Sequence, residues 1–395
     1  MIALLNPKIT CPFCFESFTV QDIQFRCLHP GCSGRALDTV YAATRGVQAI
    51  PMGHVINGKK NGFSRGPARS IDCDVCGKEA RTRLCPKCHF ELSHDVGQVD
   101  QKIIAIIGGS FTGKSHYIAS LITQLQHVVG ANFNFTVSML GDGTRERWNR
   151  DFYTPLFEKK QVLQPTQTST VDSIVKTPLI FRLTFKVGNN IRALNISFFD
   201  TAGEDMSKLR VDTLSVEARY ICKADGLIVL LDPLQIDSVR QQLPDTIQKP
   251  LPDPMARPEF IVGRLRELFE SFHHLSGSKK IPIPVAFTFS KVDTLRSIVA
   301  PDSALLQHSS HFGLLDLPDV QSVSTEIGNY VQAWINTGFY NEIDFKFANY
   351  HFFGVSSLGN QPEASGRVKI EPLRVEDPFL WILHEFKLIK GKKGR

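Results

Sequence analysis

The chain has 395 residues, of which 42% are apolar and 21% charged, and it carries a formal net charge of +6. This composition is typical of a globular protein of about two or three domains, and so modest a charge does not by itself indicate a nucleic-acid or membrane partner. No apolar run approaches the roughly 18 residues that a membrane span needs, and the apolar part of "MIALLNPKIT" is too short for a signal peptide. We therefore expect a soluble, cytoplasmic protein without a membrane span.

Cysteines mark the first part of the chain. Eight of the nine lie within the first 88 residues, in four close pairs. Three pairs have two residues between the thiols, a spacing that lets one tight turn direct both sulfurs at a single ion. A chain without an export signal does not favour disulfides, so residues 1–100 are predicted to be a zinc-ribbon-type module with two structural Zn²⁺ sites. The predicted ligands are Cys11, Cys14, Cys27, Cys32, Cys73, Cys76, Cys85 and Cys88.

The pairing of these cysteines is not fixed by their spacing. The simplest arrangement follows sequence order, with the first two pairs on one ion and the last two on the other, and an interleaved arrangement stays open. His29 could replace one sulfur in "CLHPGC". Four thiolates leave no position for water, which favours structural over catalytic zinc. We expect His89 and His94 to be ordinary surface histidines.

A basic, glycine-rich stretch, "GHVINGKKNGFSRGPARS", occupies residues 53–70 between the clusters and is predicted to be a loop or linker. Its basic side chains are those of Lys59, Lys60, Arg65 and Arg69. A phosphate-contacting arm for nucleic acid is one interpretation, and a solvated loop is the favoured one.

A phosphate-binding loop is predicted at residues 108–115, "GGSFTGKS", between an apolar strand and a helix with apolar residues at helical spacing. In this context the pattern G-x-x-x-x-G-K-[ST] lets backbone N–H groups surround phosphates, with Lys114 reaching the β and γ phosphates and Ser115 holding Mg²⁺. The predicted nucleotide contacts of this loop are Gly108, Ser110, Thr112, Gly113, Lys114 and Ser115.

The rest of the chain alternates strands and helices. Residues 178–187 and 191–200 are predicted to form a β-hairpin that ends in "DTAGED". Asp200 then stands at the carboxyl end of a strand, where a carboxylate near Mg²⁺ is needed, and Gly203 follows it. The elements that follow are a helix at 207–224, the strand "GLIVLLD", a helix at 258–275, the strand "PVAFTFSKVD", a helix at 319–337, the strand "YHFFGVSSLG" and the helix "DPFLWILHEFKL". This alternation predicts an α/β fold over residues 101–390, with a mostly parallel sheet covered by helices on both faces.

Four segments in this order, "GGSFTGKS", "DTAGED", "FSKVD" and "GVSSLG", resemble the motifs of Ras-like P-loop GTPases of the translation-factor class. The resemblance implies that Asp293 accepts hydrogen bonds from the ring N–H and amino group of guanine, while the stem of Lys291 packs on the base. It also implies that Ser356 and Ser357 belong to the last base-contacting loop. A more distant likeness is to the zinc-ribbon double-GTPases of prokaryotic conflict systems.

Several positions depart from this family's pattern. Glu204 stands where the family usually has a water-positioning glutamine, and Ser290 replaces the usual Asn or Thr, which puts support of the phosphate loop in doubt. The Mg²⁺-binding threonine of the first switch is assigned to Thr177, with Thr170 as the second choice. Insertions are expected near 129–176 and 233–258, and the second could serve partner contact or be disordered.

These features predict a GTP-binding protein that uses Mg²⁺, hydrolyses GTP to GDP slowly and acts as a molecular switch. The candidate catalytic residues are Lys114, Glu204 and Thr177. A protein activator or effector is the expected partner, because the chain shows no obvious built-in arginine finger. Two alternatives stay open: a nucleotide-gated adaptor or nucleic-acid-binding module with negligible turnover, and an ATPase that uses the same loop.

Overall fold

The computed structural model describes residues 8–58, 68–164, 178–187, 190–199 and 216–392. Several predicted positions lie outside the described residues. They are Lys59, Lys60, Arg65, Thr170, Thr177, Asp200, Gly203 and Glu204.

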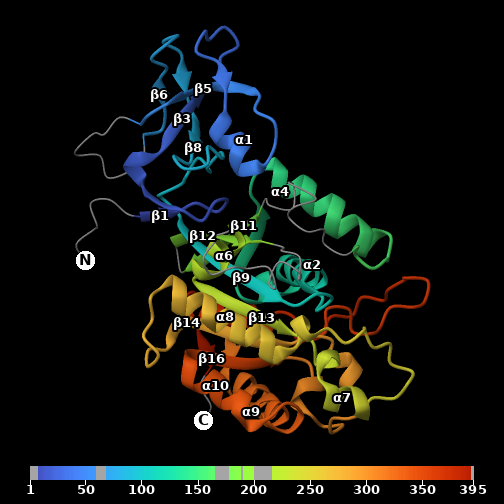
Figure 1. Cartoon of the computed structure of the whole chain (residues 1–395). Helices are drawn as coiled ribbons and strands as arrows, with labels where there is room; N and C mark the ends of the chain where they lie inside the picture. The colour runs from blue at the N-terminus through green and yellow to red at the C-terminus, as the bar shows by residue number, and fades with distance from the viewer. Residues whose placement is uncertain (1–7, 59–67, 165–177, 188–189, 200–215, 393–395) are drawn as a thin grey trace.

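The centre of the molecule is a seven-stranded sheet in the order β10-β11-β12-β9-β13-β14-β16 (Figure 1). Its strands are β9 (Asp100–Gly108), β10 (Phe135–Met139), β11 (Leu179–Val187), β12 (Asn190–Phe198), β13 (Gly226–Leu231), β14 (Ile281–Phe289) and β16 (Phe347–Gly354). The five strands from β12 to β16 are mutually parallel, whereas β11 runs antiparallel between β10 and β12. The predicted mostly parallel α/β fold and its β11–β12 hairpin are therefore confirmed.

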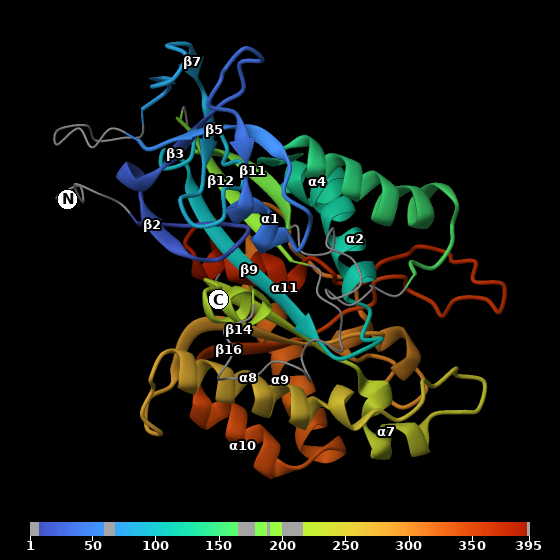
Figure 2. The same cartoon turned by 45° about the horizontal axis from the view of Figure 1, so that its top comes forward.

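Helices cover both faces of this sheet because its strands are buried on both sides. In β9, Ile103, Ala105 and Ile107 point to one core, and Ile104 and Ile106 to the other. Figure 2 shows α8, α9 and α10 on one side of the sheet and α2 and α11 on the other. The helices of the first face are α6 (Val216–Cys222), α8 (Pro258–Phe272), α9 (Leu317–Trp334) and α10 (Thr337–Lys346). Those of the second face are α2 (Lys114–Gln124), the π-helical η3 (Trp148–Glu158) and α11 (Asp377–Glu385).

The helix expected at 319–337 is present as α9, and a further helix that was not predicted, α10, follows it. The first, α9, ends at Trp334, and the side chain of Asn336 accepts a hydrogen bond from the N–H of Phe339 and begins α10. Asparagine favours this capping position because its short side chain satisfies an N–H that the helix leaves unpaired.

The cysteine-rich part folds as a small four-stranded sheet, β4-β5-β3-β8, with two short hairpins beside it. Its elements are β1 (Lys8–Thr10), β2 (Ser17–Thr19), η1 (Val20–Asp22), β3 (Gln24–Cys27), β4 (Ala36–Leu37), α1 (Thr39–Arg45), β5 (Pro51–Ile56), β6 (Ile71–Asp72), β7 (Glu79–Ala80) and β8 (Thr82–Leu84). The prediction of a loop over residues 53–70 was wrong for residues 53–56, because these belong to β5. Gly53 is required there: it has a φ of 131°, and a Cβ would lie 2.5 Å from the Cys27 carbonyl oxygen.

Both expected insertions carry regular structure where they are described. The first contributes η2 (Leu125–Val129), α3 (Gly130–Asn132), the edge strand β10 and the helix α4 (Asp142–Arg147), which continues into η3. The second contains η4 (Pro233–Gln235), α7 (Asp237–Gln242) and η5 (Pro254–Ala256). The alternative that 233–258 is disordered is therefore wrong. The remaining elements are η6 (Val292–Leu295), η7 (Ala304–Leu306), β15 (Leu315–Asp316) and β17 (Gly391–Lys392).

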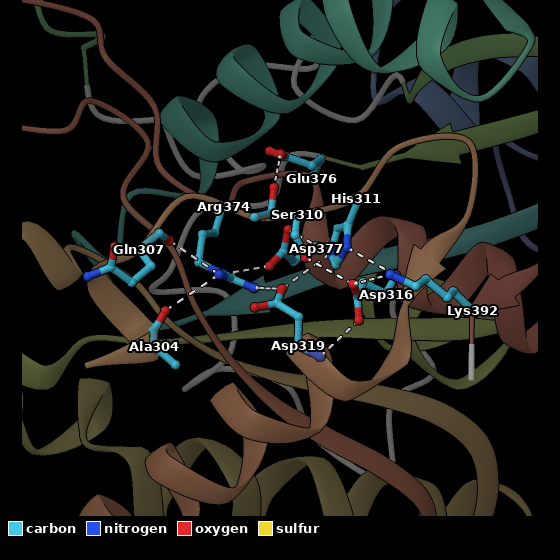
Figure 3. Close-up of polar contacts among 11 residues, drawn as sticks. Ala304, Gln307, Ser310, His311, Asp316, Asp319, Arg374, Glu376, Asp377 and Lys392 are labelled. Carbon is cyan, nitrogen blue, oxygen red and sulfur yellow. Dashed lines mark hydrogen bonds and ion pairs between the residues drawn. The ribbon is translucent and has the colours of Figure 1, made fainter. Parts of the chain in front are cut away.

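A buried polar network joins α9 to the start of α11 (Figure 3). Arg374 is ion-paired with Asp319 and, at 2.7 Å, with Asp377. Nδ1 of His311 accepts the N–H of Asp316 at 3.2 Å, which puts the imidazole proton on Nε2, 3.3 Å from Asp377. His311, Asp319 and Asp377 are close enough to hold an ion. The guanidinium already bridges both carboxylates and Nε2 carries a proton that faces Asp377, so we interpret the network as structural.

Within the ranges that the structure describes, no helix is both long and apolar enough to cross a bilayer.

Candidate nucleotide site and cysteine clusters

The loop between β9 and α2 has the backbone shape that a phosphate cradle needs. Gly113 adopts a φ of 87° directly before the helix. At Gly108 a Cβ would lie 2.8 Å from the carbonyl oxygen of Leu230 on the neighbouring strand, so only glycine fits against β13. The loop thus turns tightly at the carboxyl end of a central strand and delivers the chain to a helix N-terminus, where N–H groups favour an anion.

The lysine of this loop is held by backbone. Lys114 is 7% exposed, and its Nζ donates to the carbonyl oxygens of Gly108 at 3.0 Å and Gly109 at 3.1 Å. The Thr112 hydroxyl also donates to Gly109, at 2.9 Å. These bonds keep the ammonium inside the loop, where it can neutralise a phosphate that the N–H groups bind.

The insertion at 233–258 packs directly on the phosphate loop. A Cβ at Gly109 would lie 2.6 Å from the Cα of Ala256, which is fully buried in η5. Gln235 holds this insertion in place, since its side chain donates to the Leu251 carbonyl at 3.2 Å and accepts the N–H of Asp253 at 2.9 Å. The insertion therefore forms one wall of the site.

The two predicted base-contacting loops meet beside the phosphate loop. The Ser356 hydroxyl donates to Oδ1 of Asp293 at 2.6 Å and accepts the N–H of Gly359 at 2.8 Å. Burial raises the pKa of Asp293, and the hydrogen bond from Ser356 opposes that shift. The hydrogen bond from Ser356 fixes the orientation of this carboxylate, which can accept N–H donors.

Helix α2 connects this acceptor to the phosphate loop. The hydroxyl of Ser120 donates to the carbonyl oxygen of Ser357 at 2.7 Å. His116, in the first turn of the helix, accepts the N–H of Leu163 on Nε2 at 3.0 Å. Burial and, to a smaller extent, the charge of Lys291 lower the pKa of His116 to about 4. The imidazole is therefore neutral near pH 7 and anchors the chain that leads toward residues 165–177.

Lys291 has a partner that the sequence analysis missed. It adopts a left-handed φ of 55°, and its Nζ lies 2.7 Å from Oδ2 of the fully buried Asp232. The other oxygen of Asp232 accepts the N–H of Leu234 at 2.9 Å. The ion pair fixes the end of the lysine and leaves its methylene stem as a surface on which a flat ring can pack. The only sequence signal was a carboxylate at the end of "GLIVLLD".

Ser290 does not contact the phosphate loop through the hydrogen bonds that the structure gives it. Its N–H donates to the carbonyl oxygen of Leu231 at 2.9 Å, and its hydroxyl contacts the same oxygen at 3.4 Å. The serine therefore secures the strand end of β14 to β13.

The structure thus gathers at one edge of the sheet the predicted residues that it describes. They are Gly108, Ser110, Thr112, Gly113, Lys114, Ser115, Lys291, Asp293, Ser356 and Ser357. These residues follow β9, β14 and β16, and the carboxyl ends of neighbouring parallel strands meet at one edge. The predicted roles of Asp200, Gly203, Glu204 and Thr177 concern residues outside the described ranges.

The eight cysteines form two groups of four, but not in sequence order. One group joins the first and last pairs, and the other joins the two middle pairs. The groups are Cys11, Cys14, Cys85 and Cys88, hereafter the outer-pair site, and Cys27, Cys32, Cys73 and Cys76, the inner-pair site. The sequence-order pairing was wrong, because β3 pairs with both β5 and β8 and so brings the end of the module back to its beginning.

Both groups have the dimensions of a tetrahedral metal site. The Sγ–Sγ distances are 3.7 Å for Cys11–Cys88 and 3.8 Å for Cys14–Cys85 in the outer-pair site. In the inner-pair site the corresponding distances are 3.6 Å and 3.8 Å. Zinc–sulfur bonds of about 2.3 Å at tetrahedral angles place sulfurs about 3.8 Å apart. The N–H groups of Phe13 and Lys87 point at Cys11 and Cys85, each at 3.4 Å, as expected for thiolates. Each group could hold one ion.

His89 is not the surface residue that we expected. Its Nδ1 lies 2.8 Å from Asp38, and the imidazole is only 13% exposed. Asp38, which begins α1, also pairs with Arg26. The histidine therefore secures the turn that holds Cys85 and Cys88 to the start of α1. His94 is exposed, as predicted.

Comparison with known proteins identifies the class. The family model described as Double-GTPase 2 matches residues 102–360, and the chain belongs to this family of P-loop proteins. The matched range includes the predicted phosphate loop and both predicted base-contacting loops, and it begins after the last of the eight clustered cysteines.

The chain is also similar to a protein of Mycolicibacterium smegmatis described as "Putative ESX-1 scaffolding and assembly protein SaeC". The two are 27% identical over 238 residues, which cover 60% of this chain and 60% of that protein.

Proposed function

We propose that this protein binds GTP with Mg²⁺ and acts as a nucleotide-dependent switch in the assembly of a protein complex. The observation that carries the proposal is the pairing of a phosphate loop with an oriented carboxylate on one sheet edge. Asp293 is directed by Ser356 and can accept two N–H donors from one side, as guanine presents and adenine does not. Lys114 and Ser115 stand at the start of α2, where phosphates and their Mg²⁺ bind.

Slow hydrolysis is part of the proposal. A glutamate at position 204 can accept a hydrogen bond from water but cannot donate one to the transition state, and its charge is disfavoured near a γ-phosphate. Arginines supplied by a partner commonly accelerate such reactions by about 10³- to 10⁵-fold. A partner-dependent switch is therefore favoured over a fast enzyme.

The cysteine module is proposed to hold two structural Zn²⁺ ions and to recruit a protein partner. The tetrahedral spacing of both groups supports the zinc assignment. The description of the mycobacterial relative as a putative scaffolding and assembly protein supports a protein rather than nucleic acid as partner. Removing both ions is expected to unfold this module, because its sheet is small and its core is built around the thiols.

Calorimetric titration of the metal-loaded chain with Mg·GTP and Mg·ATP tests the proposal, together with phosphate release. We expect GTP to bind more tightly and Lys114→Ala to abolish binding. Lys102→Ala, at the other end of β9, is the matched control and should bind as the wild type does, because Lys102 pairs with Asp225 far from the phosphate loop. Tighter binding of ATP than of GTP would favour the ATPase alternative over the GTP switch. Tight GTP binding without turnover would favour the adaptor.

A further inference from the structure

A residue of the first cysteine knuckle lies inside the core of the nucleotide-binding part. Phe15 directly follows Cys14 in "CPFCF", is fully buried, and belongs to the cluster that includes Ile103, Ala105 and α8 side chains. It adopts a left-handed φ of 58°. The N–H of Phe15 donates to the carbonyl of Cys11 at 3.0 Å, so the turn that gathers the thiols also aims this ring away from its own module.

The ring of Phe15 rests on two aromatic residues beside strand β9. It meets Phe199 edge-on at 5.8 Å and Tyr220 at 5.2 Å between ring centroids. The Tyr220 hydroxyl donates to the Ile104 carbonyl at 3.0 Å and accepts the N–H groups of Ile106 at 3.2 Å and Phe199 at 3.0 Å. Phe15 therefore packs against Tyr220, whose hydroxyl links β9 to Phe199.

Glu16, the residue after Phe15, contacts helix α6. Glu16 accepts a hydrogen bond from Arg219 of α6 at 2.6 Å, and Arg219 precedes Tyr220. Phe199 and α6 are the described residues on either side of segment 200–215, which contains "DTAGED". One knuckle thus contacts described residues on both sides of segment 200–215, through Phe15 on Phe199 and Glu16 on Arg219 of α6.

We propose that the outer-pair metal site is energetically coupled to the bound nucleotide. Bound metal would hold the knuckle in the shape that places Phe15 and Glu16. These residues contact Phe199 and α6, whose Tyr220 hydroxyl bonds β9, the strand that leads into the phosphate loop. Coupling is reciprocal: if the metal favours the triphosphate-bound arrangement, the triphosphate strengthens metal binding by the same factor. The inference rests on the proposed function, since it needs a nucleotide bound at the loop that follows β9.

The inner-pair site and Phe13 provide internal comparisons. The cysteines of both sites lie in or against the module's own core cluster, and what sets the outer-pair site apart is that Phe15, next to Cys14, lies in the core of the nucleotide-binding part. Phe13 belongs to the same knuckle as Phe15 but stacks on Phe90 within the module, at 4.4 Å between centroids. A change at Phe13 therefore perturbs the same knuckle but leaves the contacts of Phe15 with Phe199 and Tyr220 in place.

The test measures zinc affinity of the full chain by competition with a chromogenic chelator, in the presence of Mg·GDP or of a non-hydrolysable GTP analogue with Mg²⁺. We expect one of the two zinc ions to bind at least about 5-fold more tightly with the analogue, within the usual range of such coupling. Phe15→Ala should remove this difference, and Phe13→Ala should keep it. Because Phe15→Ala could weaken folding, Glu16→Gln at the partly exposed ion pair is the second variant and should reduce the difference.

The outcomes separate the two proposals. A wild-type chain that binds neither nucleotide refutes the proposed function, and this inference with it. If the chain binds both nucleotides but the affinity of each zinc ion is the same with Mg·GDP and with the GTP analogue, the coupling is refuted and the proposed function stands. Loss of the difference in Phe13→Ala as complete as in Phe15→Ala would also overturn it, because the effect would then come from the knuckle in general.

Discussion

Replacing Asp293 by asparagine tests the base assignment most directly, because the surrounding hydrogen bonds fix how an asparagine would sit. The Ser356 hydroxyl accepts the N–H of Gly359, so its proton must go to residue 293. An asparagine would turn its carbonyl toward Ser356 and its NH₂ toward the base. Guanine would then meet a donor where its own two donors need an acceptor.

The size of the effect follows from the bonds lost. Each hydrogen bond to a charged partner contributes about 1.5–3 kcal/mol, so two such bonds amount to about 3–6 kcal/mol, or roughly 10²- to 10⁴-fold in affinity. Xanthosine triphosphate carries an oxygen in place of the exocyclic amine, and the new NH₂ can donate to it. Asp293→Asn should therefore weaken GTP binding and gain binding of the xanthine nucleotide.

Competition of unlabelled nucleotides against a fluorescent GTP or xanthosine triphosphate analogue measures both effects. The double variant with Ser356→Ala is the control, because without the hydroxyl the amide can turn either way and the preference should relax. A variant that binds GTP within about 3-fold of the wild type would show that Asp293 does not read the base. Lowering the pH should also weaken GTP binding in the wild type, because burial raises the pKa of Asp293 and only the ionised form accepts both donors.

Two further predictions concern the described core. Arg374→Ala should lower the free energy of unfolding by about 3–5 kcal/mol in urea denaturation, because it leaves the buried carboxylate of Asp377 and the partly buried one of Asp319 without their cation. Lys369→Ala, at an exposed ion pair, should change it by less than about 1 kcal/mol; equal losses would contradict the role given to the buried network. The pKa of His116 is lowered to about 4 in the folded state, so the unfolded chain takes up the proton first as the pH falls. The free energy of unfolding should therefore decrease by up to about 3 kcal/mol between pH 6.5 and 4. His116→Gln can still accept the N–H of Leu163 and should flatten this dependence, and an unchanged pH slope would refute the assignment.

Local patterns in the sequence were sufficient for the elements of the nucleotide-binding part. The phosphate loop, the hairpin and the strands that precede Lys291 and Ser356 each depend on residues within about ten positions. Two boundaries were missed: Asn336, which the prediction placed at the end of one helix, begins a second helix, and Gly53, which it placed in a loop, lies within a strand.

The cysteine module shows the limit of such patterns. Spacing within each pair identified the ligands, because a knuckle is a local turn. The choice of which knuckles share an ion depended on strand pairing between segments more than forty residues apart, and the outer-pair site resulted from β3 pairing with β8. Nothing in "CPFCF" distinguished Phe13, which stays in the module, from Phe15, which enters the other core.

The sequence by itself determined the class of this protein: the strand–loop–helix order, the glycines of the predicted phosphate loop, the two predicted base-contacting loops and the thiols. Those features are short-range, and the backbone geometry of a few residues suffices to specify them. Only the tertiary structure decided the partners: Asp232 for Lys291, Ser356 for Asp293, Ala256 against Gly109, and Phe15 beneath Phe199. The physical reason is that such contacts depend on how distant segments pack to bury their apolar faces, and a side chain's own neighbours in sequence carry no record of that packing.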